Sequence, residues 1–132
     1  SSWKLANPGA LDGLVYMGSL SSDNPQTAKL QEFLNSARGG DYSVTAYDAQ
    51  GYDTVQLIKM AIEKAGSTDK AKVSEAMNSI TGYLASFGQP GFELSYNADK
   101  HLGADGLCGL VLTQFGPDNT PTGPWADYQA PC

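Results

Sequence analysis

The most constraining feature of this chain is the stretch 47–66, where a polar, aromatic beginning runs directly into an amphipathic pattern. Apolar residues recur at Val55, Ile58 and Ile62, which is the spacing of one helix face. A glycine closes the stretch, where a left-handed residue commonly ends a helix. We therefore expect a long helix with a core-anchored shaft and a polar first turn, containing Tyr47, that faces a cleft. This arrangement suits ligand binding better than catalysis.

Two tyrosines, Tyr47 and Tyr52, precede the dense part of the apolar pattern. A tyrosine combines an apolar ring with one hydroxyl, so it can line a pocket or pack at the margin of a core. We expect Tyr47 to face the cleft and Tyr52 to pack in the core.

Composition excludes several classes of partner. The chain has 132 residues, enough for one domain, and its hydrophobic fraction of 41% argues against disorder. The formal net charge is −6, with only 8 lysines and arginines. Such a surface repels phosphate backbones, so we expect no nucleic-acid partner. No run of apolar residues comes close to the length of about 18 residues that a bilayer-spanning helix needs.

The other segments alternate between short strands and helices. Asn24 followed by Pro25 is a helix start, and two glycines at 39–40 end that helix. A third helix is expected between a cap at 67–69 and Gly82. Strands are expected at 14–17, 92–96 and 107–115, and the tail after residue 116 is expected to be loop. Three helices and three to four strands, with two helices in succession, indicate an α/β fold that is incomplete on its own.

Signals for catalysis are weak. His101 lies near Asp99 and Asp105, and a histidine beside carboxylates is a candidate base, but a solvated turn explains the same residues. The chain has no nucleophile elbow, no Walker pattern and no G-x-G-x-x-G. One histidine is too little for a histidine and cysteine zinc site. We expect no enzymatic activity, no metal and no cofactor.

Taken in order, several segments resemble the type I solute-binding proteins of ABC transporters, in particular the branched-chain amino-acid-binding group. The segment Y-D-A-Q-G-Y-D-T-V-Q-L-I-K-M-A-I-E-K-A-G at 47–66 carries most of the resemblance. The segments that add to it are the strand at 11–16, the helix at 25–38, the V-x-x-A-M-x-x-I helix at 73–80, the turns at 88–92 and 99–101, and the strand that ends at 115–116.

The resemblance implies part of a two-lobed, Rossmann-like fold with three α/β/α layers. By this resemblance, residues 1–42 contribute a strand and a helix to the C-terminal lobe. Residues 43–91 contribute two helices to the N-terminal lobe, and residues 92–132 return through the hinge and add a tail rich in proline and glycine. The chain is then a fragment of a longer protein, and its exposed strand edges and helix faces favour self-association.

The implied function is that of a periplasmic or lipid-anchored extracytoplasmic receptor. It captures a small solute such as an amino acid between hinged lobes and delivers it to an ABC permease. The resemblance places Tyr47 against the ligand, with Asp48 and Gln50 beside it. The alternatives are a ligand-sensing regulatory domain of the same fold and a small hydrolase that uses His101.

The two cysteines, Cys108 and Cys132, form a candidate disulfide that ties the tail to the strand at 107–115. The extracytoplasmic location implied by the resemblance favours this bridge. The alternative is a buried free thiol at Cys108.

Overall fold

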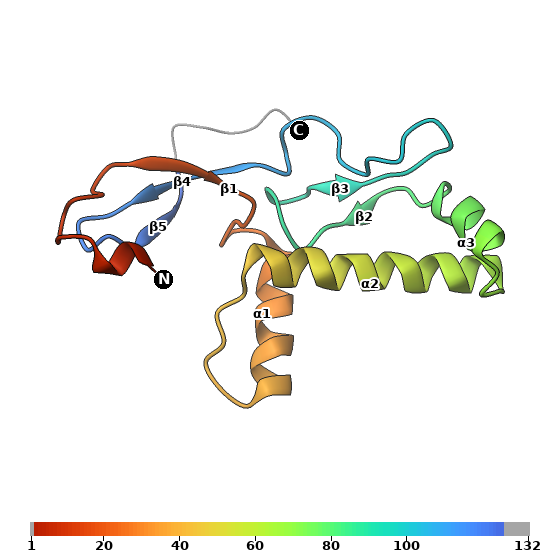
Figure 1. Cartoon of the computed structure of the whole chain (residues 1–132), viewed down its shortest axis with the longest axis horizontal. Helices are drawn as coiled ribbons and strands as arrows, with labels where there is room; N and C mark the ends of the chain where they lie inside the picture. Colours follow the sequence, from red (N-terminus) through yellow and green to blue (C-terminus); the bar gives the residue numbers. More distant parts are fainter. Residues whose placement is uncertain (1, 126–132) are drawn as a thin grey trace.

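The computed structural model describes residues 2–125 and shows an elongated molecule with two unlike ends (Figure 1). The described part contains three α-helices and five strands, in addition to a short 3-10 helix, η1. In chain order the elements are η1 (Ser2–Leu5), β1 (Val15–Gly18), α1 (Pro25–Arg38), α2 (Ala46–Ala65), α3 (Lys70–Met77), β2 (Tyr83–Leu84), β3 (Glu93–Leu94), β4 (Val111–Phe115) and β5 (Pro121–Pro124). The α/β class is confirmed, and the architecture fits part of a two-lobed binding-protein fold.

One end, here called the sheet half, consists of η1, β1, β4 and β5. The strand order is β1-β4-β5, and both pairings are antiparallel. Tyr16 of β1 lies opposite Thr113 of β4, and Thr113 lies opposite Pro124 of β5. The sheet therefore joins an early strand to two late ones across the whole length of the chain.

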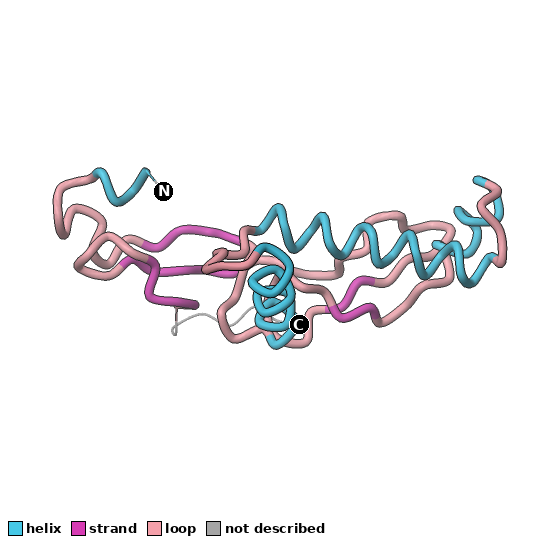
Figure 2. Tube along the Cα trace, turned by 90° about the horizontal axis from the view of Figure 1, so that it is seen from below, coloured by secondary structure: helices cyan, strands magenta, loops and turns pink. Residues whose placement is uncertain are grey.

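The other end, here called the helix half, consists of α2, α3, β2 and β3. The strands β2 and β3 form a separate antiparallel pair, and α2 runs along one side of it (Figure 2). The main apolar core lies between these elements and includes Leu57, Ile80, Phe92 and Leu94. The helix half therefore has an apolar core of its own.

The buried face of α2 differs from the expected one. Its buried residues repeat every four positions and are Ala49, Asp53, Leu57 and Ala61. Val55 and Ile58, which begin the apolar stripe expected from the sequence, are 64% and 45% exposed. Tyr52, expected in the core, is 37% exposed and packs beside Phe33 with ring centroids 6.2 Å apart. The helix is apolar on two sides, and only one of them faces the β2–β3 pair.

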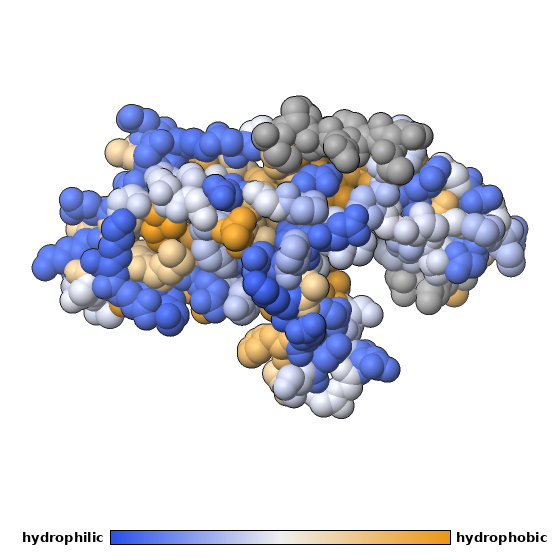
Figure 3. All heavy atoms as spheres, turned by 180° about the vertical axis from the view of Figure 1, so that it is seen from behind, coloured by the Kyte–Doolittle hydropathy of each residue, from blue (hydrophilic) through white to orange (hydrophobic). Residues whose placement is uncertain are grey.

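The second apolar side of α2 forms an open groove with α3. The groove has a volume of about 580 Å³ and is lined by residues that include Leu57, Ile58, Val73 and Met77. Seen from behind, apolar residues interrupt the polar surface over the half of the molecule that holds α2 and α3 (Figure 3).

The helix α1 begins where the sequence predicts and joins the two halves. The side-chain oxygen of Asn24 accepts a hydrogen bond from the backbone N–H of Gln26 at 2.9 Å, which caps the helix. The side-chain amide of Asn24 donates to the carbonyls of Ala85 and Phe87 at 3.2 and 3.1 Å. Asn24 is only 1% exposed, so one residue both starts α1 and anchors it to the segment 85–89, here called the junction.

The junction requires glycine at position 88. The Gly88 N–H donates to the carbonyl of Ser19 at 2.7 Å, and the backbone has φ of 81°. An added Cβ would lie 2.6 Å from the ring of Phe92 and 2.8 Å from the carbonyl oxygen of Cys108. Backbone conformation and space therefore both exclude a side chain at this position.

Two parts of the strand pattern differ from expectation. The strand β5 forms inside the tail expected to be loop, and β2 forms inside the turn-rich segment that follows α3. The strand β3 pairs with β2, which precedes it in the chain, and not with β4. The lobe boundaries at residues 42 and 91 stay a prediction.

Candidate functional site

A cleft of about 680 Å³ lies between one face of the β1–β4–β5 sheet and the loop 43–46 that leads into α2. Its lining comes from three strands, from η1, from the loop 19–22 after β1 and from the loop 43–46. This volume lies within the range typical of small-molecule sites. We call it the sheet-face cleft.

The floor of the cleft is a row of side chains across the three strands. Tyr16, Thr113 and Pro124 lie at paired positions, so they share one face of the sheet. Gly18 lies two residues beyond Tyr16 on the same face, and it leaves that part of the floor without a side chain. An added Cβ at Gly18 would meet its nearest neighbours at 3.8 and 3.9 Å, which is ordinary van der Waals contact.

Aromatic rings form one wall of the cleft. Phe115 is buried, and its ring lies 4.9 Å from that of Tyr16 and 5.7 Å from that of Trp3, measured between centroids. Trp3 is 36% exposed and, like Tyr16, lines the cleft. The buried ring therefore supports two rings that present an apolar surface to the cleft.

The hydroxyl of Thr113 is an unused polar group in this floor. Thr113 is only 7% exposed, yet among residues 2–125 no hydrogen bond to its hydroxyl is found. Among the described residues no buried side-chain nitrogen or oxygen lacks a hydrogen-bond partner, so the Thr113 oxygen, which has none, still reaches solvent at the cleft. Because Thr113 lines the cleft, this hydroxyl is available to a bound molecule.

The loop opposite the sheet is held by α1. The N–H of Val44 donates to the side-chain oxygen of Gln31 at 2.9 Å, and the Gln31 amide donates to the carbonyl of Tyr42. The N–H of Tyr42 in turn donates to the side chain of Asn35 at 2.9 Å. Two polar residues of α1 thus fix the wall that faces the sheet.

The three residues expected to contact a ligand do not converge in this cleft. Tyr47 directly follows the lining residue Ala46, but its side chain is 86% exposed. Asp48 forms the capping box of α2 with Thr45 and also accepts a hydrogen bond from Tyr42. Gln50 lines a different and smaller cavity. A ligand role for Tyr47, Asp48 and Gln50 stays a prediction.

Hydrogen bonds determine the pKa of Asp48. The Thr45 side chain is the largest cause, followed by the Thr45 backbone and the Tyr42 hydroxyl, and together they lower the pKa of this carboxyl. The carboxylate is already satisfied by the protein, so it serves the start of α2.

The carboxyl of Asp53 is the main buried polar group of the helix half. It is 1% exposed and accepts hydrogen bonds from the Ser86 N–H at 2.7 Å and the Tyr83 hydroxyl at 2.9 Å. Burial raises the pKa of Asp53 above its ordinary value, and the hydrogen bonds from Ser86 and Tyr83 oppose this shift. Because the carboxyl joins α2 to β2 and the junction, the simplest role for it is structural.

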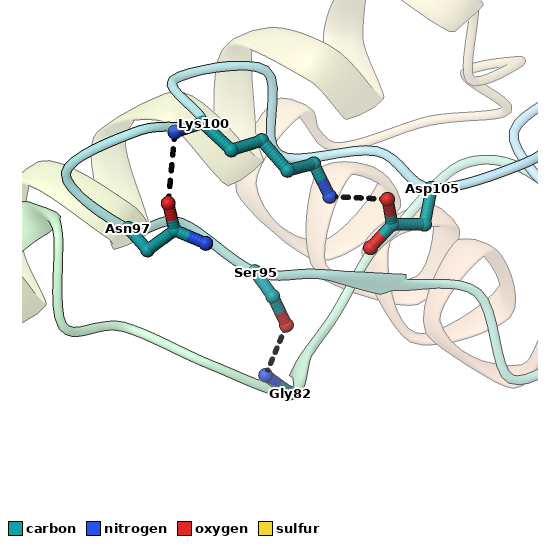
Figure 4. A network of polar contacts seen from close by, with 5 residues as sticks. All are labelled: Gly82, Ser95, Asn97, Lys100 and Asp105. Atoms are coloured by element: carbon teal, nitrogen blue, oxygen red, sulfur yellow. Dashed lines mark hydrogen bonds and ion pairs between the residues drawn. The ribbon is translucent and has the colours of Figure 1, made fainter.

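His101 receives no catalytic partner in the described part of the chain. Asp105, one of the carboxylates expected near it, pairs instead with the ammonium of Lys100 at 2.5 Å (Figure 4). Asn97 accepts a hydrogen bond from the Lys100 N–H, which closes the turn before His101. The arrangement is that of an ordered surface turn and gives the hydrolase alternative no support.

The candidate disulfide falls partly outside the described residues. Cys108 is 6% exposed and belongs to the main core. Cys132 lies beyond residue 125, so its pairing with Cys108 stays a prediction.

Sequence reasoning does not single out Trp3, Tyr16 or Thr113. The available signal was a polar threonine between the apolar Val111 and Phe115 on the buried face of a strand. The partner of that strand comes from the other end of the chain, and local pattern does not reveal such a pairing.

Comparison with known proteins agrees with this architecture. A family model described as periplasmic binding protein matches residues 1–108, and no curated protein sequence matches the chain. Within the described residues no helix is both long and apolar enough to cross a membrane. Members of this family bind solutes, and the family is a non-enzymatic one. Its name indicates an extracytoplasmic location. Because the match covers most of its length, the chain belongs to the periplasmic binding protein family.

Proposed function

We propose that this protein is the solute-binding component of an ABC importer and that the sheet-face cleft is part of its solute site. The solute is a small organic molecule, and amino acids are the class that the sequence resemblance implies. The receptor acts outside the cytoplasm, either free in the periplasm or attached by a lipid, and delivers its solute to a permease.

The observation that carries the proposal is the combination of family membership with a cleft that contains an unused, nearly buried hydroxyl. This hydroxyl is open to the cleft, where a water or a solute can pair with it. The cleft also lies beside the loop 43–46, which joins α1 to the long helix α2. Motion of this loop relative to the sheet would open or close the cleft, as solute capture between hinged lobes requires.

The proposal is tested by titrating the full-length natural protein with solutes in a calorimeter. The panel contains the common amino acids, small organic acids and neutral sugars, and each is also added in a thermal-unfolding assay, because a ligand that binds only the folded state raises the melting temperature. Saturable binding of one class supports the proposal. A panel without any binding, repeated after unfolding and refolding to remove a retained solute, would contradict it.

We further propose that this chain is one piece of a longer two-lobed receptor. The second apolar side of α2, with Val55 and Ile58 exposed, would then be covered by other parts of that receptor. The 132-residue chain alone should bind solute weakly or not at all and should self-associate. Calorimetry that shows micromolar binding by the chain alone, or light scattering that shows a clean monomer, would count against this proposal.

A further inference from the structure

The sheet-face cleft has an uncharged lining. None of the described residues that line it is aspartate, glutamate, lysine, arginine or histidine. Its polar groups are hydroxyls, such as those of Ser43 and Thr113, and its apolar groups are rings and prolines. A charged group of a solute would lose water at this wall without meeting an opposite charge, which is unfavourable.

Asp23, Asp41 and Asp48 are the described carboxylates nearest in sequence to the lining, and none of them is part of it. Asp23 and Asp48 also have protein partners. Asp48 accepts hydrogen bonds from the N–H and the hydroxyl of Thr45, at 2.9 and 2.6 Å. Asp23 accepts a hydrogen bond from the hydroxyl of Ser22 at 3.1 Å. None of these three carboxylates lines the cleft, so this wall does not provide recognition of an amino acid's charged end.

The aromatic wall favours solutes that have a flat or apolar ring face. Trp3 and Tyr16 present their rings above the buried ring of Phe115, and Gly18 leaves open floor beside them. A flat ring, or the apolar face of a sugar ring, can lie against such a surface. The Thr113 hydroxyl is then positioned to pair with an oxygen substituent on that ring.

We infer that the sheet-face cleft takes an uncharged, ring-bearing solute whose apolar face lies on Trp3 and Tyr16 and whose oxygen substituents pair with Thr113 and neighbouring hydroxyls. This inference rests on the proposed function, and it assigns an uncharged solute in place of the amino-acid class that the sequence resemblance implies. Two sources share the chemistry: a neutral sugar ring and a neutral hydroxylated aromatic ring.

The test uses calorimetry on the full-length protein with four probes. Para-hydroxybenzamide and para-hydroxybenzoate share a ring and differ in charge, methyl glucoside is the neutral sugar, and leucine is the aliphatic zwitterion. We expect one neutral probe to bind at least about tenfold more tightly than both para-hydroxybenzoate and leucine. Preference for the benzamide identifies an aromatic solute, and preference for the glucoside identifies a sugar.

The variants separate the cleft from the rest of the protein. Tyr16→Leu keeps an apolar cover over Phe115 but removes the ring, and it should weaken binding of the preferred neutral probe about tenfold. Gly18→Ala adds a methyl group to the cleft floor without a clash and should also weaken binding, which covers the case in which Tyr16→Leu fails to fold. Met17→Ala is the matched control, because Met17 lies on the opposite face of β1 and is 64% exposed.

Three results overturn the inference. Binding of leucine or para-hydroxybenzoate at least as tight as that of the neutral probes refutes the solute class while leaving the binding function intact. Unchanged affinity for the neutral probe in Gly18→Ala refutes the location. The absence of binding by all four probes and by the wider solute panel refutes both the inference and the proposed function.

Discussion

Two buried polar residues, one in each half of the molecule, differ in their hydrogen-bond partners. In the helix half, Asp53 is 1% exposed, and its carboxyl is paired with Ser86 and Tyr83. In the sheet half, Thr113 is 7% exposed, and its hydroxyl has no partner among the described residues. Paired groups stabilise the fold, whereas an unpaired one beside a cleft is available to a ligand. The contrast agrees with our proposal that the cleft of the sheet half meets the solute.

The largest expected effect comes from Asp53→Ala. The substitution leaves the Ser86 N–H and the Tyr83 hydroxyl without an acceptor, which should lower the free energy of unfolding by about 3 kcal/mol. Asp53→Asn keeps an acceptor oxygen in the same place and should stay within about 1 kcal/mol of the wild type. Urea unfolding of both variants checks this prediction, and equal losses would show that the two hydrogen bonds are not the cause.

A smaller loss is expected at the link between the halves. Asn24→Ala removes the cap of α1 and the donor to the carbonyls of Ala85 and Phe87, which should cost about 2 kcal/mol. Asn24→Asp keeps the capping oxygen but turns the donor into an acceptor that faces those carbonyls. If Asn24→Asp unfolds at the same urea concentration as the wild type, the bonds to the junction contribute nothing.

Two threonines provide a direct comparison of the halves. The hydroxyl of Thr27 donates to the Ser86 carbonyl at 2.8 Å, so Thr27→Val should cost about 1 kcal/mol of stability and leave the affinity for solute unchanged. Thr113→Val removes a hydroxyl that has no partner within residues 2–125, so its stability should change by less than about 0.5 kcal/mol while affinity falls about fivefold. Urea unfolding and calorimetry on both variants suffice, and a marked stability loss in Thr113→Val would remove the distinction between the halves.

The smallest expected effect is a pH dependence of stability that originates in Asp53. Burial raises its pKa in the folded state above the ordinary value of 3.8, so the folded protein binds the proton more tightly than the unfolded chain. The contribution of Asp53 to the free energy of unfolding is therefore fully present below pH 3.8, and it is lost as the pH rises through the pKa of the folded state. Asp53→Asn has no titratable group at this position.

The wild type should therefore lose stability relative to Asp53→Asn as the pH rises. Urea midpoints measured for both proteins from about pH 4 to about pH 7 test this, because the titration of Asp48 is common to both and cancels in the difference. A constant difference across this range would mean that the pKa of Asp53 is not raised.

Local sequence signals predicted the helices well because their ends are chemically marked. Asn24 and Asp69 cap α1 and α3, and Gly39 and Gly66 end α1 and α2 in the left-handed conformation, as expected from the sequence. The exception is the end of α3, which lies at Met77 with Asn78 as its cap and not at Gly82. The orientation of α2 could not be predicted, because its apolar residues spread over two faces and only tertiary packing selects the buried one.

The candidate site was less accessible to prediction. Tyr16 and Thr113 each belong to a segment expected to be a strand, but their pairing across the sheet depends on contacts far apart in the chain. The resemblance directed attention to Tyr47, whose chain neighbour Ala46 does line the cleft although Tyr47 itself is exposed. The resemblance therefore pointed to the segment beside the cleft, whereas no local signal pointed to the residues of its floor.

The prolines of β5 have a consequence for how this sheet can grow. Pro121 and Pro124 have no backbone N–H, so the outer margin that they form offers an incoming strand few donors. Natural sheets discourage pairing between molecules in this way. The opposite margin of the sheet, formed by β1, carries no proline, so its outward-facing N–H groups are all present. Any strand that extends this sheet, whether from the same polypeptide or from another copy, should therefore attach along β1.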